Sequence, residues 1–435
     1  MDWNEAIALL HGANWKHTKI GLERMQDFMH ALGDPQEKLR YVHIAGTNGK
    51  GSACVMTQSI LTAAGFRTGL YISPHLDQFN ERLSIDGQMI SDTELRRLAA
   101  RVRAAAETLG EEPTDFEMIT AMAFCWFEEQ HCDLVVLEVG MGGRLDATNV
   151  ISAPEVCAIM HIGLDHTEFL GDTVEKVAAE KAGILKPGAD CVLYHQLPGV
   201  MDVVQNRFAD VNPDAAAHLV TTDPAAFTAR TRTIDGQVFD YRKRRNLRIQ
   251  LLGNYQMENA MAVLDIIDCL QHRGWGISED AIRAGLSQAT WPGRFELLSR
   301  KPLLIVDGAH NPNGVEALVD TIRAYFPGQK INFVMGVMKD KDYHTMLRLI
   351  APYAAHFITE LPDAHRALRP EELKSEIRTY FDGPVETADS VTAAVKRAME
   401  IAKGTDAITI CFGSLYQVAD IRNYFLSSGR STSHV

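Results

Sequence analysis

Short apolar runs alternate with amphipathic stretches along most of this chain, a pattern typical of an α/β protein in which helices cover a sheet. Tyr41–Ala45 is apolar and contains β-branched residues, so it predicts a buried strand, and Gly51–Ala64 predicts the helix that follows it. Asp133–Val139 is almost continuously apolar, and Val156–Ile162 is similar, as expected of central parallel strands. The first part of the chain is therefore expected to contain a mostly parallel sheet.

Capping residues and turn signals predict the other elements of this part. Residues 2–32 predict two helical pieces, broken near His11–Ile20. A further strand is predicted over Phe66–Ile72, and further helices over Ser91–Leu109, Asp115–Gln130 and Val174–Ala182. Residues 190–252 are less regular, with two or three short strands and a helix near Val200–Phe208. The basic run Arg242–Arg245 within them predicts a solvated turn.

The pattern becomes a regular alternation of strands and helices after Pro302. Strands are predicted at Leu303–Asp307, Ile331–Val337, His356–Thr359, Val385–Thr387 and Ala407–Phe412. This alternation predicts a second, smaller doubly wound α/β domain. A long amphipathic helix from Gly253 to about His272 comes before it, and the two helix breakers of Trp291–Arg294 predict an interdomain hinge. We therefore expect one domain over residues 1–294 and another over residues 295–435.

The composition narrows the class of protein. The chain has 435 residues, too many for one ordinary core, and its 46% hydrophobic and 23% charged residues are ordinary for a soluble globular protein. A formal net charge of −13 argues against a nucleic-acid-binding surface, but anionic small molecules stay open because local positive charge binds those. The N-terminus lacks the regions of a signal peptide, and no stretch approaches the ~20 apolar residues of a membrane helix. We expect a monomer without membrane association.

Seven cysteines are scattered along the chain without a C-x-x-C pair, which predicts neither a zinc site nor a disulfide framework. Five of them lie in apolar periodic segments: Cys54, Cys125, Cys157, Cys269 and Cys411. Reduced core cysteines suit the cytosol, so we expect a cytoplasmic protein.

The candidate chemistry begins in the turn after the first strand, which reads G-T-N-G-K-G-S over residues 46–52. A strand, a glycine-rich turn, a lysine and a helix form the arrangement that holds a nucleotide's phosphates. Backbone N–H groups and the helix N-terminus face the anion, and Lys50 adds a full positive charge. The generic P-loop is G-x-x-x-x-G-K-[ST]. Here Ile44 replaces its first glycine and Gly51 separates Lys50 from Ser52. The alternative is a glycine-rich turn without a ligand.

Polar groups also follow other strands predicted for this sheet. Glu138 lies at the end of the Asp133–Val139 run, where a carboxylate is costly unless it is paired or binds a metal. His166 comes shortly after Val156–Ile162. Ligands of open α/β sheets bind at the carboxyl ends of strands, so Glu138 and His166 are expected to face the same phosphates and to help hold Mg²⁺. The alternatives are a salt bridge between Glu138 and Arg144, and an ordinary loop histidine.

Four other polar segments each allow an ordinary structural interpretation. Ser73–Arg82 is either a ligand loop at the same end of the sheet or an ordinary surface loop. By position alone, Lys181 is a cation near a helix C-terminus. In the C-terminal domain, Asn311 follows the first strand and is either part of a site or a helix N-cap. Gly413–Ser414 follows the last strand and is either part of a site or a tight turn.

Nine motifs, in order and over nearly the whole chain, together resemble one family. They are G-T-N-G-K-G-S at 46–52, S-P-H at 73–75, F-N-E-R at 79–82, E-V-G-M-G-G-R-L-D-A-T-N at 138–149, L-D-H-T-E-F-L-G at 164–171, E-K-A-G-I at 180–184, W-P-G-R at 291–294, D-G-A-H-N-P at 307–312 and G-S-L-Y at 413–416. The chain resembles folylpolyglutamate synthase and the bifunctional dihydrofolate/folylpolyglutamate synthase, which belong to the ATP-dependent Mur ligase superfamily. The unusual P-loop fits this family's own form.

The resemblance implies roles for the residues that match the family's motifs. The phosphates of ATP would be held by Gly46, Thr47, Asn48, Gly49, Lys50, Gly51 and Ser52, and further ATP contacts would come from Asn259, Arg294 and Asp307. The ligands of two Mg²⁺ ions would be Ser73, Glu138, His166 and a carbamylated Lys181. The folate would lie near the N-terminal segment and near Ser73, Pro74, His75, Arg82 and Phe116, and the incoming glutamate near His310 and Ser414. Catalytic roles would fall to Lys50, Lys181, Asp307 and His310.

The implied activity is ATP-dependent ligation. The γ-phosphate of ATP passes to a carboxylate, and the amine of L-glutamate attacks the resulting acyl phosphate to give an amide, ADP and phosphate. The carboxylate would be the γ-carboxyl of a folate, with dihydropteroate as an additional or the sole acceptor. Mg²⁺ and Lys50 would offset negative charge, and closure of the two domains would exclude water.

Two other classes of protein remain as alternatives. A Mur-type peptidoglycan ligase shares the P-loop and the amide chemistry, but normally carries an additional N-terminal domain, for which the residues before Tyr41 leave no room. A non-catalytic nucleotide-binding regulator would not need the catalytic set to be present together. Glutamate-dependent release of ADP would distinguish an enzyme from such a regulator.

Overall fold

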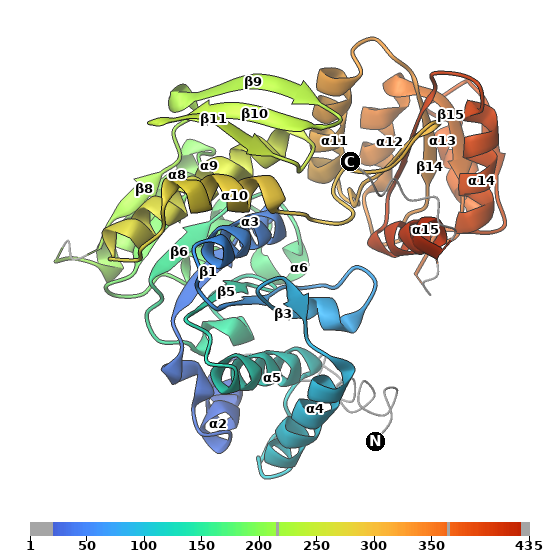
Figure 1. Ribbon diagram of the computed structural model, residues 1–435. Coiled ribbons are helices and arrows are strands. Elements are labelled where there is room, and N and C mark those ends of the chain that lie inside the picture. Colours follow the sequence, from blue (N-terminus) through green and yellow to red (C-terminus); the bar gives the residue numbers. More distant parts are fainter. Residues whose placement is uncertain (1–20, 215–216, 363–365, 428–435) are drawn as a thin grey trace. The chain divides into compact units, whose positions relative to one another are not determined.

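The computed structural model describes residues 21–214, 217–362 and 366–427 (Figure 1). The chain divides into two compact units. Met1–Thr228, Asp240–Leu247 and Glu258–Ala289 belong to the first, and Ala229–Phe239, Arg248–Met257 and Thr290–Val435 belong to the second. Each unit contains its own large sheet, as the two-domain α/β prediction requires. The domain boundary at residue 294 stays a prediction.

The first unit is organised around an eight-stranded sheet with the order β4-β3-β2-β5-β1-β6-β7-β8. Its strands are Tyr41–Ala45 (β1), Thr68–Tyr71 (β2), Leu83–Ile85 (β3), Gln88–Met89 (β4), Leu134–Glu138 (β5), Val156–Ile159 (β6), Asp190–Leu193 (β7) and Leu219–Thr221 (β8). All pairs from β2 to β8 are parallel, whereas β3 and β4 form an antiparallel edge. The predicted parallel sheet is thereby confirmed.

The helices of this unit agree with the prediction to within a few residues at most ends. They are Glu23–Ala31 (α2), Lys50–Ala63 (α3), Asp92–Ala106 (α4), Asp115–Glu129 (α5), Thr167–Leu170 (α6), Val174–Ala182 (α7), Pro198–Val211 (α8), Asn254–His272 (α9) and Glu279–Gln288 (α10). Helices α3 and α10 approach closely at Gly285, where a Cβ atom would lie 2.4 Å from the Cα of Ile60. Helices α4 and α5 lie side by side (Figure 1) and share one buried apolar cluster with Val135 and Leu137 of β5. The first of the two helical pieces predicted for residues 2–32 lies outside the described residues.

Residues 190–252 contain more strands than the sequence predicts. Besides β7, β8 and α8, they form a separate sheet of Phe227–Thr233 (β9), Gly236–Tyr241 (β10) and Arg244–Ile249 (β11). The predicted solvated turn at Arg242–Arg245 is wrong for Arg244, whose side chain is 1% exposed. Its guanidinium is 2.7 Å from Asp268 and 2.9 Å from Glu279, so two carboxylates neutralise the buried charge.

The second unit contains a six-stranded sheet with the order β12-β13-β17-β14-β15-β16. Its strands are Glu296–Arg300 (β12), Leu303–Val306 (β13), Ile331–Met335 (β14), Ala354–Thr359 (β15), Val385–Thr387 (β16) and Ile408–Phe412 (β17). Its helices are Pro312–Tyr325 (α11), Tyr343–Ile350 (α12), Pro370–Ile377 (α13), Val391–Ala402 (α14) and Leu415–Ser427 (α15). The five predicted strands are confirmed as a parallel set, and β12 is an additional antiparallel edge strand.

Two expectations from composition can also be compared with the structure. All seven cysteines are buried and free, which confirms the prediction of reduced core residues. Within the described residues, no helix is both long and apolar enough to cross a membrane.

Candidate active site

The glycine-rich turn after β1 is anchored to the end of β6. The backbone N–H groups of Thr47 and Asn48 donate to the carbonyl oxygen of His161 at 2.8 and 3.2 Å. Gly49 precedes α3 with φ = +85°, a conformation that glycine adopts without strain. The amides of the first turn of α3 have no partner within the helix. The turn therefore presents a helix N-terminus suited to an anion, as the sequence predicts.

Two lysines meet at the carbonyl oxygen of Gly46. The Nζ of Lys50 lies 2.9 Å from this oxygen and the Nζ of Lys181 lies 2.8 Å from it. Lys181 is buried, and burial together with the nearby charge of Lys50 lowers its pKa to about 7. Lys181 lies in the last turn of α7, as its position predicts, and its side chain is buried beside the P-loop.

Glu138 ends β5 and is 4% exposed. Its Oε2 atom accepts a hydrogen bond from the backbone N–H of Ser73 at 2.9 Å, so the structure brings these two predicted residues together. The alternative partner Arg144 forms its ion pair with Glu180 instead, at 3.0 Å.

His166 is the predicted metal ligand that the structure leaves exposed. It lies on the loop after β6, directly before α6, and has φ = +50°. Across the described residues, no group of three or more histidine, cysteine, aspartate or glutamate side chains could hold a metal ion. Mg²⁺ usually binds one or two carboxylates together with water and phosphate oxygens, so Glu138 at the P-loop edge still fits such a site.

The predicted folate-side residues also lie near this edge. The Nε of Arg82 donates to Nδ1 of His75 at 2.9 Å within the loop that follows β2. Phe116, in the first turn of α5, covers Gly140, where a Cβ atom would be 2.4 Å from the ring. Pro74 is exposed in the same loop as His75.

Asn259 is the predicted ATP residue on α9, within the first unit. A Cβ atom at Gly49 would lie 2.4 Å from its Oδ1 atom, so the Asn259 side chain packs directly against the P-loop. Only glycine leaves room for this contact.

The predicted residues of the second unit gather at neighbouring strands β13 and β17. Asp307 follows β13, and its buried carboxylate accepts from the backbone N–H groups of Phe295 and Ala309, both at 2.8 Å. Burial raises the pKa of Asp307 although Arg294 opposes the shift. A Cβ atom at Gly308 would lie 2.6 Å from the guanidinium of Arg294, which places Arg294 beside the same turn.

The turns after β13 and β17 also have structural roles. Asn311 caps α11 by accepting a 2.7 Å hydrogen bond from the N–H of Gly314, so its N-cap interpretation is confirmed. Gly413 has φ = +117°, and its N–H donates to Ala309, which joins the two turns. His310 contacts the carbonyl oxygen of Gly308 at 2.8 Å, and Ser414 is buried at the start of α15.

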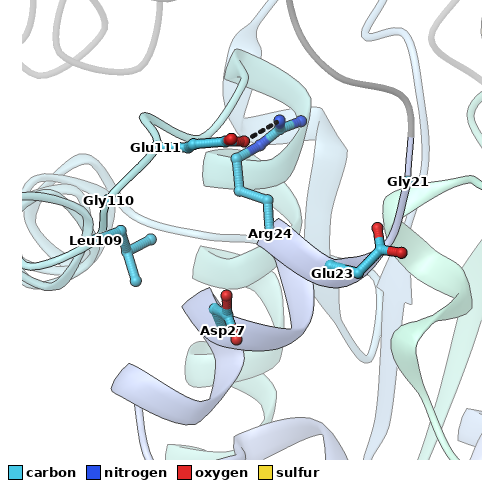
Figure 2. Close-up of a pocket in the computed structure, with 7 residues that line it drawn as sticks. All are labelled: Gly21, Glu23, Arg24, Asp27, Leu109, Gly110 and Glu111. Atoms are coloured by element: carbon cyan, nitrogen blue, oxygen red, sulfur yellow. Dashed lines mark ion pairs between the residues drawn. The ribbon is translucent and has the colours of Figure 1, made fainter.

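A cavity of about 230 Å³ near the start of α2 is not predicted by any sequence pattern (Figure 2). Arg24 lines it and pairs with Glu111, and its guanidinium also binds Glu117 through two hydrogen bonds of 2.9 and 3.0 Å. Glu117 caps α5 together with Thr114. The T-x-x-E spacing was a readable capping signal, but the pairing with Arg24 depends on the fold.

The predicted residues of the first unit share one edge of the sheet. Strands β2, β5, β1 and β6 are neighbours, and their carboxyl ends lead to Ser73, Glu138, Gly46 and His166 respectively. A basic turn, two lysines and a carboxylate at one sheet edge suit a polyphosphate with a divalent cation.

Known protein families match both parts of the chain. Residues 44–267 match the Mur ligase middle domain, and residues 293–415 match the glutamate ligase domain of Mur ligases. The dihydrofolate synthase/folylpolyglutamate synthase of Bacillus subtilis (strain 168) is 35% identical over 432 residues, covering 97% of this chain and 98% of that protein. The folylpolyglutamate synthase of Lacticaseibacillus casei is 34% identical over 445 residues, covering 98% and 99%.

Solved structures extend the similarity to the fold. A Mycobacterium tuberculosis folylpolyglutamate synthase (FPGS) complexed with ADP and AMPPCP has a TM-score of 0.86 at 30% identity, with 98% of this chain and 99% of that chain covered. An FPGS–AMPPCP–folate complex has a TM-score of 0.84 at 32% identity, with 98% and 100% covered. The similarity thus spans both units, and the chain belongs to the folylpolyglutamate synthase/dihydrofolate synthase family of Mur ligases.

Proposed function

We propose that this protein is an ATP-dependent ligase that adds L-glutamate to the γ-carboxyl group of a reduced folate, and that dihydropteroate is a second acceptor. The proposal rests on one observation above the others. Lys50 and Lys181 converge on the Gly46 carbonyl at the P-loop edge, in a chain similar along its length to folylpolyglutamate synthases.

In this proposal, the P-loop edge activates the acid. The N-terminus of α3 and the Lys50 ammonium bind the ATP phosphates and offset the charge that develops as the γ-phosphate moves to the carboxylate. The product is an acyl phosphate, whose phosphate is a far better leaving group than a carboxylate oxygen. The amine of L-glutamate then attacks the acyl carbon, and the tetrahedral intermediate collapses to an amide and inorganic phosphate.

Ser73 and Glu138 would hold Mg²⁺ in this site, with His166 completing the set. When bound, the ion offsets charge on the phosphates. We propose two ions, the second of which needs a carbamylated Lys181. The neutral Nζ of a lysine adds to CO₂ to give a carbamate and a proton, and the lowered pKa of Lys181 supports this because burial and the charge of Lys50 both favour the neutral amine.

Both units would supply the remaining groups. Asp307 and Arg294 are proposed ATP contacts, and His310 and Ser414 are proposed neighbours of the incoming glutamate. The Asn259 side chain, packed on Gly49, is a further proposed ATP contact. We also propose that the protein is a cytoplasmic monomer.

The test is ADP release by the purified protein with Mg²⁺-ATP and L-glutamate, with tetrahydrofolate or dihydropteroate offered in separate reactions. Turnover with both acids is expected. Turnover with tetrahydrofolate alone would restrict the protein to polyglutamate extension, and turnover with dihydropteroate alone would restrict it to folate synthesis. No turnover with either acid would refute the proposal and direct the search to other Mur-type acids.

A further inference from the structure

The loop between β2 and β3 closes on itself at a narrow neck. The backbone N–H of Ile72 donates to the carbonyl oxygen of Arg82 at 3.0 Å, directly beside the antiparallel pair of Tyr71 and Leu83. The residues between these ends therefore form a compact loop of the Ω type. This loop carries Ser73, Pro74, His75 and Arg82, which we assign to the folate side of the site.

One half of the loop is fixed to the body of the unit. The second half forms a short 3₁₀ helix, Phe79–Arg82 (η3). The side-chain amide of Asn80 donates to the carbonyl oxygen of Ile90 at 2.7 Å and to the carboxylate of Asp92 at 3.0 Å. Asn80 is 7% exposed, so these buried hydrogen bonds fix η3 to the rest of the unit.

The first half of the loop is held by one carboxylate, that of Glu81. Glu81 accepts hydrogen bonds from three consecutive backbone amides: Leu76 at 2.6 Å, Asp77 at 3.2 and 3.3 Å, and Gln78 at 3.0 Å. Three successive N–H groups facing one anion form a nest, and hydrogen bonds to a charged acceptor are stronger than neutral ones. The loop thus folds around the negative charge of one of its own residues, Glu81.

The same arrangement fixes the histidine of the loop. The guanidinium of Arg82 is always a donor, so Nδ1 of His75 must be the acceptor of their 2.9 Å hydrogen bond. A neutral ring then carries its proton on Nε2. His75 comes directly before the three amides bound by Glu81, and Arg82 comes directly after Glu81, so both partners depend on where Glu81 holds the chain.

We infer that Glu81 is a positioning residue for the acyl substrate: its carboxylate orders residues 76–78 and so sets His75 and Arg82 in place before the folate binds. This inference rests on the proposed function for its substrate but on the loop geometry for its mechanism. A preformed loop spares the ligand the entropy cost of ordering it. Loss of the carboxylate should therefore weaken binding of the folate and leave binding of ATP intact.

The test compares Glu81→Gln with wild type and with Glu107→Gln, a matched control at the exposed C-cap of α4. Glutamine keeps the length of the side chain but removes its charge and one acceptor oxygen. We expect the amides of residues 76–78 to exchange hydrogen about ten-fold faster in Glu81→Gln, with no change in the strands β1 and β5. We expect KM for tetrahydrofolate to rise about ten-fold, with KM for ATP and kcat within about two-fold of wild type. The control should match wild type throughout.

Three results would overturn the inference: unchanged exchange at residues 76–78, faster exchange without a rise in KM for tetrahydrofolate, or an equal rise in KM for ATP. The last would mean that the substitution loosens the whole unit. A wild-type protein that is inactive on both acids would refute the proposed function instead. The exchange rates would then still decide whether Glu81 orders the loop, because they require no substrate.

Discussion

The carboxyl edges of the two large sheets differ in the titratable groups that they bury: the first buries a lysine as well as a carboxylate, whereas the second buries carboxylates. At the edge of the first sheet, Lys181 is buried next to Lys50 and its pKa falls to about 7. At the edge of the second, Glu360 follows β15 with no exposed surface, and burial raises its pKa to about 8, with a contribution from Asp420. Asp307 at this edge is also buried and its pKa is also raised.

The two edges deal with burial in different ways. The lysines of the first edge share a backbone carbonyl, and burial together with the charge of Lys50 disfavours the charged form of Lys181. An incoming polyanion would stabilise both ammonium groups, so this edge is suited to one. Asp307 of the second edge is held by two backbone amides, whereas the carboxylate oxygens of Glu360 have no hydrogen-bond partner in the described structure. We therefore expect the first edge to respond to ligand and the second to respond to pH.

Removal of Lys50 should have the largest effect. Lys50→Ala removes the full positive charge at the start of α3, where charge develops on the transferred phosphoryl group, and should lower kcat/KM by about 10³-fold. The measurement is glutamate-dependent ADP release, with circular dichroism as the control for folding. Wild-type turnover in this variant would show that the edge of the first sheet is not the ATP site, and the comparison of the two edges would fail.

Replacement of Lys181 should have the second largest effect and should distinguish a carbamylated lysine from a free amine. If Lys181 is carbamylated, Lys181→Met should lose about 10²-fold in activity, as a missing metal ligand would. Wild-type protein prepared without CO₂ should lose activity and regain it when bicarbonate is added, whereas Lys181→Met should not respond. Full activity in CO₂-free buffer would show that Lys181 acts as an amine.

Glu360→Gln should change the stability of the second unit in a pH-dependent way. An unfolded glutamate releases its proton near pH 4.5 and the folded Glu360 near pH 8, so the folded state binds more protons between these values and stability falls as pH rises. Glutamine does not titrate. The variant should therefore be more stable than wild type by up to about 5 kcal/mol above pH 8 and equal to it near pH 4.5.

Hydrogen exchange in β14 and β15 measures this difference within the full-length protein, and β1 and β5 of the first sheet serve as the internal control. A stability difference between variant and wild type that does not depend on pH would mean that Glu360 is already ionised or paired. The edge of the second sheet would then not respond to pH as expected.

The exposed pair at the first edge should have the smallest effect. Arg144 and Glu180 lie 3.0 Å apart with side chains 55% and 27% exposed, and exposed ion pairs contribute little. Arg144→Gln should change the free energy of unfolding by less than about 1 kcal/mol, measured by urea denaturation. A much larger loss would mean that charge at this edge is more strongly coupled than the burial pattern indicates.

The order and type of most elements could be predicted from local sequence. Continuous apolar runs such as Asp133–Val139 mark central strands because both faces of a parallel sheet are covered. The failures lie where long-range contacts decide. Arg244 looks solvated among basic neighbours, but two carboxylates from helices distant in the sequence neutralise its charge and allow it to be buried. The edge strand β12 lacks a continuous apolar run and pairs only because β13 lies next to it.

The candidate site was predictable as a set of motifs but not as a geometry. The sequence by itself determined the glycine-rich turn, the lysines and the acids that follow strands, since these depend on residue type and spacing. Only the tertiary structure decided that Lys181 is buried at Gly46, that Glu138 holds Ser73 rather than Arg144, and that Glu81 gathers three amides. Each of these depends on strand order and burial, which set distances and pKa values that no local pattern contains.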